Sequence, residues 1–102
     1  MQMQAQKNQS LDGARRMLNV MATLRVVPSP DALDSIKQDL REMLRGEGRN
    51  PAQSIAVRAI GAAAMGMLPS EAICREGARE VDGLIHAQRV HERAGSAAPR
   101  QR

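Results

Sequence analysis

Apolar residues recur at helical spacing along most of the chain, and this pattern predicts the secondary structure. In the first segment they fall at intervals of three and four residues, as Leu11, Ala14, Leu18 and Met21. One face of an amphipathic helix has this spacing. Ser10 is a suitable N-cap for that helix. The same pattern, bounded by prolines and glycines, predicts helices at about 10–25, 29–45, 50–67 and 70–92.

The second segment has the most regular apolar stripe. Ser29, Pro30 and Asp31 make a strong helix start, because serine caps, proline suits the first position and aspartate favours the positive first turn. The stripe consists of Leu33, Ile36, Leu40 and Met43. It is narrow, like the seam of a coiled coil, and so indicates a surface for another helix.

The third segment, Ile55 to Leu68, is apolar on every side except at Arg58 and consists largely of Ala and Gly. A helix of this kind is normally buried in a core or a membrane. The segment is shorter than the roughly 20 residues that cross a bilayer, so we expect a central helix and no membrane span. Small residues let other helices approach closely, and we expect the closest packing at Gly61, Ala62 and Gly66.

The fold class predicted from these segments is all-α, a small four-helix bundle-like domain over residues 10–94. The only strand-like piece is the stretch from Leu24 to Val27, before Pro28. Residues 1–9 are polar and Gln-rich, which indicates a flexible arm. Residues 95–102 have no apolar pattern and indicate a disordered basic tail.

Composition adds an argument about assembly and compartment. The chain of 102 residues contains no Phe, Tyr or Trp, so its core must be built from smaller aliphatic side chains and is light. A light core favours a homodimer or a partner. The single cysteine excludes an intramolecular disulfide, and the N-terminus lacks the apolar stretch of a signal peptide. These features predict a cytoplasmic protein, and the bias towards Arg and Ala is typical of GC-rich bacteria.

The distribution of charge argues against a DNA-binding face. The formal net charge is +4, but residues 10–94 carry twelve basic and eleven acidic side chains. The excess therefore comes from the ends of the chain, at Lys7, Arg100 and Arg102. Nucleic-acid-binding domains usually carry a basic face on the folded part.

Candidate catalytic and metal-binding residues do not form a familiar pattern. His86 and His91 are five residues apart, whereas helical metal pairs use spacings of three or four. Cys74 has no histidine near it in helical register to serve as a base, and its apolar neighbours favour a buried, inert thiol. The carboxylates are spread along charged faces, as in Glu76 and Glu80. We therefore expect no enzymatic activity, no cofactor and no metal.

Two stretches resemble parts of a known DNA-binding family. Residues 66–80, with Ser70-Glu71 followed by Ile73 and alternating Arg and Glu, resemble the second helix of ribbon-helix-helix repressors. Residues 24–36 are similar to the ribbon and first helix. The resemblance implies a DNA-binding transcriptional regulator, which is the alternative hypothesis, in a ribbon-helix-helix form or in a helix-turn-helix form made by the third and fourth helices. It departs from the family in spacing, because a whole apolar helix separates the two stretches.

The leading hypothesis is a regulatory protein that binds another protein through a helical apolar face. The seven methionines favour this hypothesis, because the methionine side chain makes adaptable binding surfaces. We assign partner binding to Leu33, Ile36, Leu40, Met43, Met17 and Met21. One form is an antiactivator that occupies the dimerisation surface of a transcription factor, by analogy of class with the small helical antiactivators of bacterial quorum sensing.

Overall fold

The computed structural model describes the backbone of residues 2–97 and the side chains of residues 9–90. Within this range all regular elements are helical: α1 (Gln2–Leu24), α2 (Pro30–Gly46), the short 3₁₀ helix η1 (Pro51–Gln53), α3 (Ile55–Ala64) and α4 (Glu71–Ala97). The all-α fold with four main helices is therefore confirmed for the described part of the chain.

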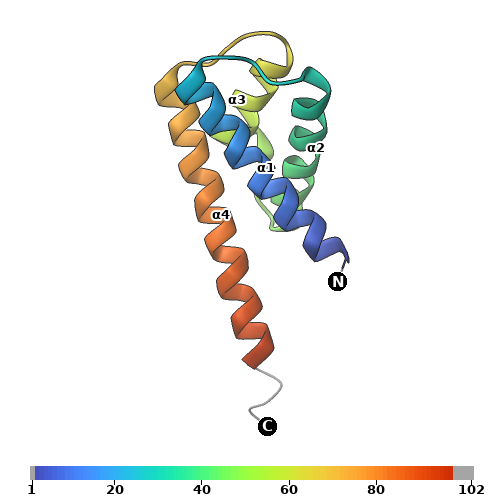
Figure 1. The fold of residues 1–102 in the computed structure, drawn as a ribbon. Coiled ribbons are helices and arrows are strands. Elements are labelled where there is room, and N and C mark those ends of the chain that lie inside the picture. Colours follow the sequence, from blue (N-terminus) through green and yellow to red (C-terminus); the bar gives the residue numbers. More distant parts are fainter. Residues whose placement is uncertain (1, 98–102) are drawn as a thin grey trace.

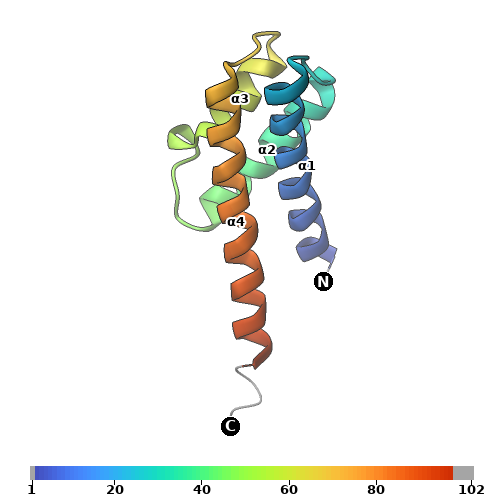
Figure 2. The same cartoon turned by 60° about the vertical axis from the view of Figure 1, so that its left-hand side comes forward.

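The four α-helices form two layers. α1 lies beside α4, and α2 and α3 lie behind this pair (Figures 1 and 2). The lower part of α4 extends past the other helices, which accounts for the elongated dimensions of 52 × 22 × 20 Å. None of the described helices is long and apolar enough to cross a membrane.

All four α-helices contribute side chains to one aliphatic core. Its largest fully buried members are Leu11, Leu18, Met21, Leu33, Leu40, Leu44, Ile60, Val81 and Cys74. Burial of one such large aliphatic side chain is worth about 1.5–3 kcal/mol. The apolar stripes predicted in the first and second segments thus face one core within a single chain.

The ends of α1 and α4 differ from the prediction. α1 starts at Gln2, so the Gln-rich residues 2–9, expected to be a flexible arm, continue the helix. Ser10 is consequently not an N-cap: its hydroxyl donates a hydrogen bond to Asp39 Oδ2 of α2, at 2.8 Å. α4 continues to Ala97, and the remaining part of the predicted tail, 98–102, lies outside the described residues.

The single helix predicted at 50–67 is divided in the structure. Asn50 caps η1 through a 3.0 Å bond from the Ala52 N–H. Ser54 then starts α3, accepting a hydrogen bond from the Val57 N–H at 3.1 Å. α3 ends where Gly66 adopts φ 87°, and the Met67 N–H bonds back to the Ala62 carbonyl at 2.9 Å. Side-chain caps and a left-handed glycine therefore override the continuous apolar pattern.

The closest helix packing is not at the predicted glycines. Gly66 is an exposed helix stop with open space around it, and Ala62 is half-buried. A Cβ on Gly61 would meet only the flexible Lys37 side chain, at 3.3 Å. A Cβ on Gly13 of α1 would meet the end of the Ile36 side chain at 2.9 Å. The close approach to another helix's backbone, however, is at Gly77 of α4, where a Cβ would lie 3.2 Å from the Ala56 Cα of α3. Ala56 thus belongs to the small-residue helix as predicted, but the glycine opposite it comes from α4.

The strand-like stretch before Pro28 forms no strand. Residues 25–29 are an irregular linker between α1 and α2. The resemblance to ribbon-helix-helix repressors required a ribbon at this position, so the structure contradicts that part of it.

Candidate functional site

Two linkers lie at one end of the molecule, and together with the adjoining helix ends they carry six of the eight exposed large apolar side chains among the described residues. The α1–α2 linker and the α3–α4 linker both lie at the upper end of the bundle (Figures 1 and 2). We define the apolar end surface by the exposed side chains of these linkers and the adjoining helix ends: Leu24, Val26, Val27, Met65, Met67 and Ile73.

Local geometry explains why the apolar side chains of the first linker point outward. Arg25 follows α1 with φ 55°, a left-handed conformation, and its Nη1 donates to the Met21 carbonyl at 3.1 Å. The left-handed conformation of Arg25 ends α1. Val26 and Val27 are therefore no longer in helical register with the buried residues of that helix. Val27 precedes Pro28 and is therefore excluded from the helical conformation.

The second linker is turned outward by Gly66. Its left-handed φ stops α3 and places Met65 and Met67 on either side of the turn. Met65 is 77% exposed and Met67 58% exposed, whereas Leu68 packs against the core. The two methionines are consequently not core fillers, unlike Met21.

The apolar end surface includes large side chains that are mostly exposed to solvent. Leu24 is 65% exposed, although the preceding turn of α1 buries Met21 completely. Single exposed apolar residues are normal, but a contiguous group of them marks an interaction site. Charged side chains lie at the same end of the bundle: Arg25 stands between Leu24 and Val26, and Asp31, Glu71 and Arg75 belong to the first turns of α2 and α4.

The residues assigned to partner binding from the sequence lie elsewhere. Leu33, Leu40 and Met21 are fully buried. Ile36, Met43 and Met17 are half-buried and pack against the same core. The seam on α2 does receive other helices, but these are α1 and α3 of the same chain. The narrow apolar stripe of α2 indicated a face that another helix covers, but it could not indicate which helix. None of the residues assigned to partner binding belongs to the apolar end surface.

Sequence reasoning missed the end surface because its members lie outside any helical stripe. The sequence pattern places Met65 and Met67 in the apolar third segment. It places Val26 and Val27 in the strand-like stretch before Pro28. A signal was present in the sequence: apolar side chains stand directly beside Gly66, Pro28 and Pro69, at positions where helices stop. Apolar residues at such stops cannot continue the buried stripe.

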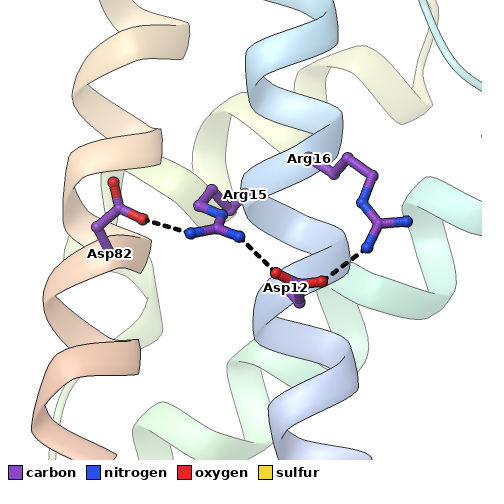
Figure 3. A network of polar contacts seen from close by, with 4 residues as sticks. All are labelled: Asp12, Arg15, Arg16 and Asp82. Carbon is purple, nitrogen blue, oxygen red and sulfur yellow. Dashed lines mark hydrogen bonds and ion pairs between the residues drawn. The ribbon is translucent and has the colours of Figure 1, made fainter.

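An ion network joins α1 to α4 on the outer face of the bundle. Asp12 accepts hydrogen bonds from Arg15 Nη2 and Arg16 Nη2, both at 2.7 Å, and Arg15 Nη1 reaches Asp82 at 3.4 Å (Figure 3). The hydrogen bond from Arg16 is the main cause that lowers the pKa of Asp12 below its ordinary value. Because these side chains are solvated, the network adds little stability.

A shallow depression of about 590 Å³ adjoins this network and is lined by Arg15, Arg16, Asn19, Val20, Thr23, Leu24 and Asp82. It is open to solvent, and Arg15 and Arg16 are already paired with the two carboxylates of Asp12 and Asp82. No nucleophile with a neighbouring base lines it.

The remaining chemically interesting residues have structural surroundings. Cys74 is fully buried, and this burial raises the pKa of its thiol above the ordinary value. Glu80 accepts a hydrogen bond from the Ala56 N–H at 2.9 Å and so helps to cap α3. His86 is exposed, and the His91 side chain lies outside the described range. Among the described residues, no three His, Cys, Asp or Glu side chains gather as a metal site would require.

Comparison with protein-family models, with curated proteins and with solved structures found no match for this chain.

Proposed function

We propose that this chain is a small, non-enzymatic bacterial regulatory protein that binds another protein through the apolar end surface. The observation that carries the proposal is the joint exposure of Leu24, Val26, Met65 and Met67 on two linkers at the same end. Removing such a group from water on binding is favourable by roughly 25 cal/mol per Å² of apolar area. Met65 and Met67 add adaptability, because unbranched thioether side chains fit apolar faces of varied shape.

The partner that fits this surface best is the apolar face of a helix. The surface is aliphatic and lacks aromatic rings, so it is suited to the Leu, Ile, Val and Met side chains that line amphipathic helices. In its concrete form the proposal is an antiactivator: the end surface covers a helix through which a transcription factor would otherwise dimerise.

A pull-down with matched variants tests the proposal. Bacterial lysate is passed over the parent protein, over the double variant Met65→Lys with Met67→Lys, and over the control Val90→Lys. Val90 is 51% exposed but belongs to α4, outside the end surface. All three proteins should fold, since the altered side chains are exposed. A protein retained by the parent and by the control, and lost from the double variant, is expected; identical retention by all three would contradict the proposal.

The antiactivator form requires a second measurement. Once the retained protein is identified and purified, the parent chain should reduce its binding to its own operator DNA, and the double variant should not. A retained protein that is not a transcription factor would refute the antiactivator form and leave protein binding itself supported.

The homodimer predicted from the light core competes for the same surface. The seam on α2 is covered within one chain, so the apolar end surface is where a second copy would bind. Sedimentation of the parent at tens of micromolar decides this question. A dimer that becomes monomeric in the double variant would assign the surface to self-association.

A further inference from the structure

Basic side chains from α2 and α3 gather on one face of the bundle, away from the apolar end surface. Lys37, Arg41 and Arg45 follow one another at four-residue steps on α2, which places them on one side of that helix about 6 Å apart. This side faces α3, because a Cβ on Gly61 would lie 3.3 Å from Lys37 Cδ.

Arg58 of α3 joins the same face. It precedes Gly61 by three residues and is exposed. α2 and α3 run in opposite directions (Figure 1), so the turn of α3 that holds Arg58 lies beside the turn of α2 that holds Arg41. We define the basic face as Lys37, Arg41, Arg45 and Arg58.

The charge of this face is poorly neutralised. Asp34 contacts Lys37 at 3.7 Å, but within residues 9–90 no ion pair involves the three arginines. The Asp39 carboxylate points towards α1, where it accepts a hydrogen bond from the Ser10 hydroxyl. Glu42 lies about 100° further around α2 than Arg41, and it neighbours Arg45, which follows it by three residues, but no ion pair between Glu42 and Arg45 forms. By contrast, Arg15, Arg16 and Arg75 each pair with a carboxylate.

We propose that the basic face binds the phosphate backbone of duplex nucleic acid. Arginine suits this role because its planar guanidinium donates two parallel hydrogen bonds to a phosphate. A single strand would be bound mainly through stacking of its bases on aromatic side chains, and the chain has no Phe, Tyr or Trp. The proposal does not depend on the apolar end surface. The near-neutral total of residues 10–94 does not reveal this face, because a total charge sums over all sides of the helices.

Salt-dependent binding tests the proposal. Fluorescence anisotropy follows a labelled duplex of about 20 base pairs in KCl from about 25 to 200 mM. The parent should bind at low salt, and log K should fall with log salt at a slope of about −3 to −4, the value for four cations. The double variant Arg41→Gln with Arg58→Gln should lose at least ~10-fold in affinity, and its slope should be smaller by about 2.

A matched variant separates this face from general charge. Arg79→Gln with Arg89→Gln removes the same charge from α4, at exposed positions, and should change the affinity by less than about 2-fold. Circular dichroism confirms that each variant folds; Arg45→Gln with Arg58→Gln replaces the first variant if Arg41→Gln unfolds the chain.

Four results would each overturn the proposal. They are undetectable binding at the lowest salt, equal loss of affinity in both double variants, tighter binding of a single strand than of the duplex, and tighter binding of polyglutamate. The last result would assign the face to an acidic protein segment. None of them bears on the pull-down, so the two proposals succeed or fail separately.

Discussion

At the scale of single residues, two glycines of α4 have opposite roles. At Gly77 a Cβ would press against the Ala56 Cα and the Leu18 side chain, at 3.2 and 3.3 Å, whereas around Gly83 there is open space. Gly77→Ala gains up to ~1 kcal/mol in helix propensity but costs about 1–3 kcal/mol in overpacking. We therefore expect Gly77→Ala to lower stability by up to ~2 kcal/mol and Gly83→Ala to raise it by up to ~1 kcal/mol.

Urea unfolding followed by circular dichroism measures both glycine variants. Gly61→Ala should resemble Gly83→Ala, because the Lys37 side chain that it meets can move aside. If Gly77→Ala stabilised the chain as much as Gly83→Ala, α3 and α4 would not be in tight contact at this point.

Cys74 predicts a dependence of stability on pH. Burial raises the pKa of its thiol in the folded state, so the folded chain holds this proton at pH values where the unfolded chain has lost it. The stability contribution is complete below the unfolded pKa of about 8.5 and is lost as pH rises through the folded pKa. The free energy of unfolding should therefore fall more steeply above about pH 8.5 in the parent than in Cys74→Ala.

Few other groups obscure this measurement. The chain has no tyrosine, and its only lysines are Lys7 and Lys37. Urea titrations at several pH values are compared between the parent and Cys74→Ala. Parallel pH profiles for the two proteins would show that the thiol reaches solvent in the folded state.

At the scale of elements, three serines precede helices but cap them differently. Ser54 is buried and accepts a hydrogen bond from the Val57 N–H. Ser70 is exposed and accepts a hydrogen bond from the Ile73 N–H at 3.2 Å. Ser29 makes no hydrogen bond of this kind through its side chain. Replacement by alanine should cost about 1–2 kcal/mol at Ser54, about 0.5–1 kcal/mol at Ser70 and less than about 0.5 kcal/mol at Ser29.

Thermal melts of the three serine variants test this order. The greatest loss is expected at Ser54, because its removal also leaves the buried Val57 N–H without a partner. Equal losses at Ser54 and Ser29 would mean that the break between η1 and α3 is not held by a side-chain cap.

At the scale of the whole molecule, one core shared by all four α-helices predicts a single cooperative unfolding transition. The chain lacks aromatic reporters, but the buried Cys74 thiol can report on tertiary structure. Its reaction with a thiol reagent in urea should become fast at the midpoint observed by circular dichroism. Reaction at a clearly lower urea concentration would show that the end of the bundle near Cys74 opens before the helices unfold.

The sequence by itself determined the helices and their apolar faces. Periodic apolar stripes placed Leu11 and Leu18 on one face, and Leu33 and Leu40 on a seam for another helix, because helical spacing is a local property. Proline and glycine positions indicated where α2 and α4 begin and where α2 ends. The same local rules failed within 50–67, because the Ser54 cap starts a separate helix at the beginning of the apolar run and Gly66 stops that helix before the run ends.

Only the tertiary structure decided which faces are covered and which stay exposed. The seam at Leu33 and Leu40 became core because α1 and α3 of the same chain cover it. The apolar end surface and the basic face each combine residues from segments distant in the sequence, as Arg41 and Arg58 show. A stripe specifies that a face is to be buried, but its partner depends on how the connections fold the helices against one another.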